Sequence, residues 1–283
     1  MPLLFKKIKD LRNYLHSVKC ERNASIGFVP TMGYLHEGHK ALIRRSKLQN
    51  DVTVVSIYVN PTQFGPGEDY ERYPRDLERD MSVCEELGVD AVFAPSDEEI
   101  YPEGCKTEVY VREVSDILEG KFRPGHFKGV ATVVLKLFNI VQPDRAYFGE
   151  KDYQQLKIVQ RLVRDLLLPV EIVPVETVRE PDGLAYSSRN VYLSPEERES
   201  ALSIYRAFLL AQEMIRQGER SVETIKKEME RFILSHPHVS GIDYIEITDP
   251  ELNPKEVVEG GDRILVAIRI GSTRLIDNWK VEL

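Results

Sequence analysis

The chain has 283 residues, of which 42% are hydrophobic and 30% are charged. This composition is typical of a folded, water-soluble protein and excludes an intrinsically disordered one. The 46 acidic residues outnumber the 38 basic residues and give a net charge of −8. A general nucleic-acid-binding protein needs a basic surface, so the charge argues against that class. It still permits a local basic pocket for one phosphorylated ligand.

The chain also lacks the marks of a disulfide-rich, zinc-binding or membrane protein. Its three cysteines lie far apart and form no CxxC pair. An apolar run at residues 130–141 is interrupted by Lys136 and Asn139 and is too short for a membrane span. The first residues carry no apolar signal-peptide core. We therefore expect a cytoplasmic protein that binds neither membrane nor nucleic acid.

Helical and strand-like patterns of apolar residues alternate through the first two thirds of the chain. The spacing predicts helices over residues 4–18, 40–48, 74–87, 130–141 and 153–167. Runs of β-branched and aromatic residues predict strands over residues 26–30, 52–59, 89–94, 107–111, 145–148 and 170–178. Because parallel strands need crossover connections, this alternation predicts an α/β domain with a parallel sheet.

The pattern changes after residue 178. Ser194-Pro-Glu-Glu197 is a good helix start, and two helices are expected over residues 195–217 and 221–235. Strands are expected next, over residues 242–247 and 264–270. Helices followed by strands without alternation predict a separate, smaller α+β domain. We therefore expect domains over residues 1–178 and 179–283.

The first segment with chemical content is Pro30-Thr-Met-Gly-Tyr-Leu-His-Glu-Gly-His39, between a predicted strand and a predicted helix. Ligands of parallel sheets bind at the carboxyl ends of strands. Gly33 and Gly38 allow the backbone to approach a ligand, and the helix start offers N–H groups to a phosphate. His36 and His39 are suited to stabilise charge on a phosphorus centre. The alternative is a glycine turn with two surface histidines.

The second segment follows the next strand. Asn60 and Gln63 carry donors and acceptors suited to the hydroxyl and carboxylate groups of a substrate. The proline- and glycine-rich stretch at 61–73 is expected to be a long loop, and long loops in compact domains are often lids. An ordinary connector is the alternative.

The third segment is a basic cluster in an acidic protein. It suits either an anion site or a solvated basic loop. Its charged residues are Lys121, Arg123, His126 and Lys128.

The fourth segment lies between a short strand and a helix. Lys151 could bridge phosphate oxygens, and Asp152 could cap the helix. Gln155 lies one turn further and could face the same crevice.

The fifth segment stands near the expected domain boundary. Ser187, Ser188 and Arg189 combine two hydroxyls and a guanidinium in three residues, which suits a phosphate.

Taken together, these segments closely resemble the pantoate–β-alanine ligase (pantothenate synthetase) family, which belongs to the HxGH nucleotidyltransferase superfamily. The matching stretches are PTMGYLHEGH, VNPTQF, YPR, RPGHFKGV, FGEKDYQQL, DGLAYSSRN and the C-terminal RLIDNWKVEL. The order and spacing of the set are far more specific than HxGH alone.

The resemblance implies a Rossmann-like nucleotide-binding domain and a smaller C-terminal domain that closes over the ATP site. It implies that ATP and Mg²⁺ drive the condensation of (R)-pantoate with β-alanine. The products would be pantothenate, AMP and diphosphate, formed through a pantoyl-adenylate. A homodimer is also implied.

The resemblance carries specific roles onto this sequence. His39 would be the main catalytic residue, helped by His36, Lys151 and Arg189. Gln63 and Gln155 would hold pantoate. The ATP-binding residues would be Met32, Gly33, Tyr34, Leu35, His36, Glu37, Gly38, His39, Gly149, Glu150, Lys151, Asp152, Val178, Tyr186, Ser187, Ser188 and Arg189. Tyr186 departs from the aliphatic or methionine side chain expected there. Asp80 is considered as a neighbour of the metal but is not assigned as a ligand.

Three other functions are weighed against this one. A nucleotidyltransferase that acts on a phosphate ester and stops after releasing diphosphate would share HxGH, but would not need the amides of Gln63 and Gln155. A non-catalytic nucleotide sensor would not need both histidines, Lys151 and Arg189. An aminoacyl-tRNA synthetase is disfavoured by the acidic charge and by the lack of an anticodon-binding domain.

Overall fold

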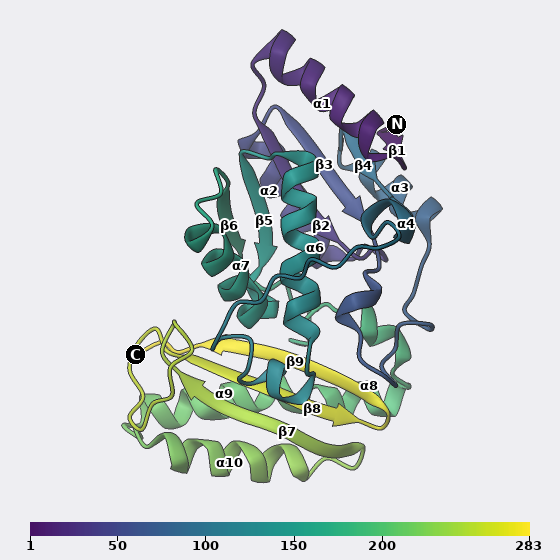
Figure 1. Cartoon of the computed structure of the whole chain (residues 1–283). Coiled ribbons are helices and arrows are strands. Elements are labelled where there is room, and N and C mark those ends of the chain that lie inside the picture. Colours follow the sequence, from purple (N-terminus) through teal and green to yellow (C-terminus); the bar gives the residue numbers. More distant parts are fainter. The chain divides into compact units, whose positions relative to one another are not determined.

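The computed structural model describes residues 1–283, except for the side chain of Arg22. The chain forms two compact units, whose elements are labelled in Figure 1. The first comprises residues 1–150 and 155–176, and the second comprises residues 151–154 and 177–283. The main division falls close to the boundary expected at residue 178. The sequence pattern does not anticipate that residues 151–154 belong to the second unit.

The first unit is built on a parallel sheet. Among the described residues, six strands form this sheet, all paired in parallel. In spatial order they are β1 (Leu3–Phe5), β4 (Ala91–Phe93), β3 (Val52–Ile57), β2 (Ile26–Thr31), β5 (Arg145–Gly149) and β6 (Glu171–Val175). The central strands β2 and β3 are almost entirely buried. Burial on both faces explains why these strands are mostly apolar, with only small polar side chains such as Thr53 and Ser56 among them.

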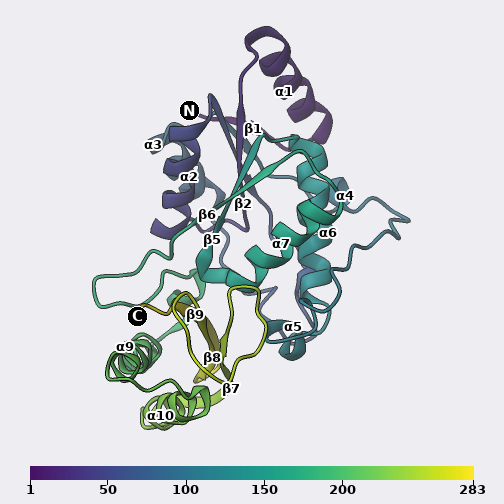
Figure 2. The ribbon, with the colours of Figure 1, turned by 90° about the vertical axis from the view of Figure 1, so that its left-hand side faces the viewer.

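Helices cover both faces of this sheet. Figure 2 shows α2 and α3 on one side and α1, α6 and α7 on the other. The helices are α1 (Ile8–Arg22), α2 (Glu37–Gln49), α3 (Leu77–Glu86), α4 (Asp97–Ile100), α5 (Glu119–Phe122), α6 (His126–Val141) and α7 (Tyr153–Asp165). From β2 the chain winds outward to β3, and it later returns to place β5 on the opposite side of β2. Such a reversal of winding is where ligands bind in α/β sheets.

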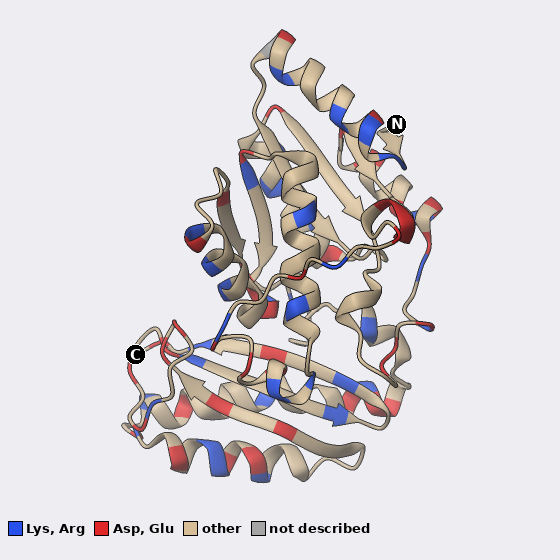
Figure 3. Cartoon of the chain, viewed as in Figure 1, with Lys and Arg blue, Asp and Glu red and all other residues tan. Residues whose placement is uncertain are grey.

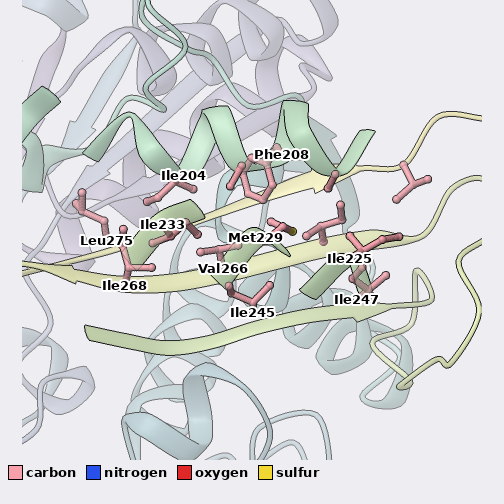
Figure 4. Packing of buried hydrophobic residues seen from close by; sticks show 14 of the residues in the cluster. Ile204, Phe208, Ile225, Met229, Ile233, Ile245, Ile247, Val266, Ile268 and Leu275 are labelled. Atoms are coloured by element: carbon pink, nitrogen blue, oxygen red, sulfur yellow. The ribbon is translucent and has the colours of Figure 1, made fainter. Parts of the chain in front are cut away.

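The second unit is the predicted α+β fold. Its antiparallel sheet contains β7 (Val239–Thr248), β8 (Arg263–Ile270) and β9 (Thr273–Lys280). The helices are α8 (Pro195–Ala201), α9 (Ser203–Arg216) and α10 (Val222–Leu234). Figure 4 shows Phe208 of α9 and Met229 of α10 packed against Val266 and Ile268 of β8, and all four are fully buried. The predicted fold class is therefore confirmed in both units.

The sequence pattern is wrong or silent at a few elements. Residues 107–111 form no strand, and they are mostly exposed, with the N–H of Val109 bonded to the hydroxyl of Thr132 at 2.9 Å. The helix expected over 195–217 is divided at Leu202. Strands β1 and β9 are not predicted: β1 has three residues, and β9 contains the charged Asp277, which is buried in an ion pair.

The charges of the second unit are mixed in sign. Acidic and basic residues are interspersed along α10 (Figure 3). Lys226 pairs with Glu246, and Lys227 pairs with Glu223. Such a surface lacks the single-sign stripe that attracts a polyanion. Within the described chain, no helix combines the length and the apolar character needed to cross a membrane.

Candidate active site

The turn between β2 and α2 carries the HxGH segment at the carboxyl end of a central strand. Gly33 and Tyr34 both have positive φ, 82° and 50°. The hydroxyl of Thr31 accepts the N–H of Gly33 at 3.1 Å. Glycine adopts this left-handed conformation readily, whereas a tyrosine needs support from its surroundings. The result is a sharp reversal that starts α2 directly after the strand.

The two histidines of this turn lie together at the start of α2. His36 is the N-cap residue, and the centroids of the two imidazole rings are 4.0 Å apart. The backbone N–H of His36 donates to Nδ1 of His39 at 3.3 Å. Because a backbone N–H can only donate, Nδ1 of His39 accepts, and the neutral ring carries its proton on Nε2. His39 therefore presents an N–H donor on the side of the ring away from the helix start.

Most backbone donors of the turn are already engaged. The N–H groups of residues 33–36 have acceptors in Thr31, Asp80 and His39. Among the described residues, the structure gives no such acceptor to the N–H groups of Glu37 and Gly38 in the first turn of α2. Unsatisfied N–H groups and the helix dipole favour an anion at this position.

After β3, Asn60 caps a 3₁₀ turn (Pro61–Gln63), and Gln63 is its last residue. The amide of Asn60 donates to Oε1 of Gln63 at 3.1 Å and to the carbonyl of Gly129 at 3.2 Å. Its oxygen accepts from the hydroxyl of Tyr101 at 2.9 Å. Nε2 of Gln63 lies 3.1 Å from the sulfur of Met32. The structure thus brings the first and second segments together, with the Asn60 amide engaged by protein groups.

The basic cluster at 121–128 holds the loop after β3. The Arg123 guanidinium makes two hydrogen bonds to Glu68, at 2.8 and 2.7 Å. His126 Nδ1 lies 2.8 Å from the carbonyl of Gln63, and Lys128 pairs with Glu108. Arg123 and His126 therefore form neither an anion site nor a solvated loop. Their partners in the chain connect the loop at 61–73 to the start of α6.

His126 is neutral in this arrangement. Arg123 can only donate to Nε2, at 3.1 Å, so Nδ1 carries the proton and donates to Gln63. The side chain is buried, and burial, assisted by the Arg123 charge, lowers its pKa to about 4. The unfolded chain takes up a proton near pH 6.5, whereas the folded chain resists protonation until about pH 4.

This difference predicts a loss of stability in acid. The contribution of His126 is fully present above pH 6.5 and is lost as the pH falls toward 4, by about 3 kcal/mol in total. Denaturant unfolding at several pH values should show the fall. A His126→Gln variant should lose that part of the pH dependence between pH 6.5 and 5, and His16→Gln, at an exposed position of α1, should keep it. Equal pH slopes in all three proteins would contradict the assignment.

The fourth segment follows β5, which pairs with β2 in the sheet. Gly149 ends the strand, and Glu150 begins a 3₁₀ turn at the same edge. Gln155 lies in the first turn of α7 and is half-buried. The predicted phosphate and pantoate residues of the first unit therefore stand at the carboxyl ends of neighbouring strands β3, β2 and β5.

Lys151 and Asp152 belong to the second unit. The ammonium of Lys151 lies 3.5 Å from the carboxylate of Asp152. The backbone carbonyl of Lys151 accepts from the amide of Asn278 at 2.9 Å. The chain at Lys151 is therefore held by β9. The helix-capping role expected for Asp152 stays a prediction.

The fifth segment forms a narrow loop in the second unit. The N–H of Tyr186 donates to the carbonyl of Val178 at 3.1 Å, which closes the loop. Ser187 Oγ accepts the N–H of Arg189 at 3.2 Å and starts a 3₁₀ turn (Ser188–Tyr192). Arg179 makes two hydrogen bonds to the buried Asp277, at 2.6 and 3.1 Å. The loop is thus anchored to β9 through Arg179, the residue next to Val178.

Asp80, the acid considered as a neighbour of the metal, is hydrogen-bonded to the HxGH turn. Both oxygens of Asp80 accept backbone N–H groups, and the side chain is fully buried. In the part of the chain that the structure describes, no group of three or more His, Cys, Asp or Glu residues could hold a metal ion. The contacts of Asp80 and Arg79 with the HxGH turn join residues that are distant in the sequence, so no local sequence pattern predicts them.

A parallel sheet whose switch point carries two histidines at the start of a helix defines an α/β enzyme of the HxGH class. The chain belongs to the pantoate–β-alanine ligase family, because the family model described as Pantoate-beta-alanine ligase matches residues 3–280. It is therefore a ligase that joins pantoate to β-alanine. The family resemblance predicted from the sequence is confirmed.

Named relatives agree with this result. The chain is 71% identical over 282 residues to the pantothenate synthetase of Aquifex aeolicus (strain VF5), and 100% of each chain is covered. It matches the crystal structure of pantothenate synthetase from Thermus thermophilus with a TM-score of 0.93 and 52% identity, over 98% of this chain and 99% of that chain. A pantoate-beta-alanine ligase from Francisella tularensis, complexed with beta-gamma ATP and beta-alanine, matches with a TM-score of 0.82 and 38% identity, over 99% and 98%.

Proposed function

We propose that the chain uses ATP to condense (R)-pantoate with β-alanine through a pantoyl-adenylate, and releases AMP and diphosphate. One observation supports this proposal most. The two histidines and the first N–H groups of α2 suit phosphates, and the Gln63 amide, which suits a hydroxy acid, reaches Met32 of the same turn at 3.1 Å. A phosphate-binding set and a substrate-binding set therefore meet at one sheet edge. The related ligase from Francisella tularensis was solved with beta-gamma ATP and beta-alanine.

The proposed roles follow from the donors that each residue offers. His39 donates from Nε2 to the phosphates, with His36 beside it, and the cations Lys151 and Arg189 neutralise phosphate charge. The remaining ATP contacts are proposed for Met32–His39, Gly149–Asp152, Val178 and Tyr186–Arg189. Gln63 and Gln155 hold pantoate. Asn60, whose amide is engaged by protein groups, acts by holding Gln63 in place.

These groups are sufficient for the chemistry. The pantoate carboxylate attacks the α-phosphorus, and diphosphate leaves. The barrier depends on orientation and on charge at the phosphate, which positioned donors and cations lower. An acyl-adenylate is already a good acyl donor, so β-alanine needs no covalent enzyme intermediate. Because the adenylate reacts with water, we propose that the loop at 61–73 shields it.

Mg²⁺ is proposed to arrive as part of the substrate, bound to the phosphates of ATP. The described residues offer no cluster for a resident metal, and both oxygens of Asp80 are occupied. Magnesium in such sites keeps water and substrate phosphates as ligands and needs few protein carboxylates. We further propose a cytoplasmic homodimer that binds small molecules and neither nucleic acid nor membrane.

Exchange of labelled diphosphate into ATP tests the reaction order. Pantoate alone should support exchange, and rapid quenching should show a burst of about one diphosphate per site before β-alanine is added. AMP release should then require β-alanine. A protein that releases diphosphate only when β-alanine is present would refute the stepwise reaction. Diphosphate release with a phosphate ester in place of pantoate would favour the nucleotidyltransferase alternative.

A further inference from the structure

Asp80 of α3 holds the HxGH turn from within the first unit. Its side chain has 0% exposure. One carboxylate oxygen accepts the N–H of Tyr34 and the other accepts the N–H of Leu35, both at 2.7 Å. A buried carboxylate is unfavourable unless it is hydrogen-bonded. These two short hydrogen bonds therefore stabilise the backbone conformation of the turn.

Arg79, the residue before it, contacts the same peptide from another direction. Its guanidinium donates to the carbonyl of Leu35 at 2.8 Å and lies 4.6 Å from the centroid of the Tyr34 ring. Asp80 thus fixes the N–H groups of two residues, while Arg79 fixes the following carbonyl and the aromatic side chain. Together, Asp80 and Arg79 bind two backbone N–H groups and one backbone carbonyl of the same turn.

The turn needs this support because its backbone is unusual. Tyr34 adopts a positive φ of 50°, a conformation that costs about 1 kcal/mol or more for a residue with a side chain. A Cβ added to Gly33 would lie 2.9 Å from both Asp80 and Ile57. The carboxylate therefore fills the inside of the turn, where its negative charge satisfies donors in the way a bound anion would.

We infer that Arg79 and Asp80 are positioning residues, which fix the Gly33–Leu35 turn and thereby the two histidines at the start of α2. This inference rests on the proposed role of His36 and His39 at the phosphates of ATP. Neither Arg79 nor Asp80 needs to touch the substrate. They affect the reaction by fixing the positions of the two histidine rings.

Asp80→Asn tests the inference with little change in size. The asparagine places an NH₂ group against one of the two backbone N–H groups, so one hydrogen bond is replaced by two opposed donors. Displacement of a reacting group by about 1 Å can cost roughly 10²-fold in rate. We expect the kcat of pantoate-dependent ATP–diphosphate exchange to fall about 10- to 100-fold, with the pantoate KM within about twofold. Amide hydrogen exchange over residues 30–40 should become faster, while the interior of α6 stays protected.

Two further variants keep the test decisive. Asp76→Ala removes the N-cap of α3, where Asp76 accepts the N–H of Arg79 at 3.0 Å. It should lower the melting temperature and leave the exchange kinetics unchanged. Arg79→Met, at a partly exposed position, should fold even if Asp80→Asn does not, and should lower kcat without raising the pantoate KM.

The outcomes separate this inference from the proposed function. If the wild-type protein shows no exchange activity, or if His39→Ala is fully active, neither the proposed function nor this inference has a basis. If His39→Ala is inactive while folded Asp80→Asn and Arg79→Met keep wild-type kcat, the positioning role is wrong and the proposed function stands. Equal losses of kcat in Asp76→Ala and Asp80→Asn would also overturn it, because general destabilisation of α3 would then explain the effect.

Discussion

Replacement of His39 by alanine is expected to lower the rate of adenylate formation by about 10²–10³, the effect of losing one donor to a transition state. The reason is geometric. The N–H of His36 occupies Nδ1 of His39, so the donor that this ring can offer to the phosphates is Nε2–H. Single-turnover measurement of diphosphate release from ATP and pantoate would report this step without contribution from β-alanine.

The structural role of His39 must be separated from its chemical role. His39→Gln keeps an acceptor at the third helical position, where glutamine commonly accepts the N-cap N–H, but it loses the imidazole donor. Both variants should be slow and folded. His16→Ala, at an exposed position of α1, should behave as wild type. A fast His39→Gln together with a slow His39→Ala would assign His39 to helix capping alone.

Substitution of Gly129 by alanine is the second change with a large expected effect. An added Cβ would lie 2.3 Å from the carbonyl oxygen of Thr62 and 2.7 Å from the N of Gln63. These are backbone atoms of the 3₁₀ turn and cannot move aside alone, so the turn must shift away from α6. We expect the KM for pantoate to rise by about 10- to 100-fold, as for a group displaced by roughly 1 Å, and the KM for ATP to change far less.

Gly65→Ala is the matched control for this prediction. Its Cβ would lie 3.8 Å from the nearest atom, which belongs to the side chain of Glu68. It should leave both Michaelis constants unchanged. Gln63→Ala should reproduce the Gly129→Ala defect if displacement of the Gln63 amide is the cause. A folded Gly129→Ala with wild-type affinity for pantoate would show that Gln63 does not hold that substrate.

The sequence predicts those parts of the fold that depend on local pattern. The buried strands β2 and β3 are predicted because apolar and β-branched residues dominate them. Ser194 with Glu197 forms the expected capping box, with bonds of 3.1 and 3.0 Å. Strand β9 escapes prediction because the burial of Asp277 depends on its ion pair with Arg179, nearly a hundred residues away. Residues 107–111 have strand-like side chains but no partner strand.

In the candidate site, too, local patterns are predictable from the sequence and long-range contacts are not. Residue type and spacing single out the histidine pair and Gln63 as candidates, and the structure brings Gln63 to Met32 of the histidine turn. Their roles stay predictions. The functions of Asp80 and His126 could not be predicted, because each depends on a contact between distant segments, from α3 to the turn after β2 and from α6 to the turn after β3. A basic cluster in a sequence shows the charge of its residues, but it does not show which carboxylate or carbonyl groups they bind in the fold.

The occupied N–H groups of the HxGH turn have a consequence for the thermodynamics of the ATP site proposed above. Fixing the backbone of one residue costs about 1–2 kcal/mol of conformational entropy. A loop that becomes ordered only around its ligand subtracts that cost from the affinity. Here Thr31, Asp80 and His39 satisfy the turn from inside the protein, so folding has already ordered it. In the proposed ATP site, the nucleotide would meet this turn in its final shape, so ordering of the turn would not subtract from its affinity.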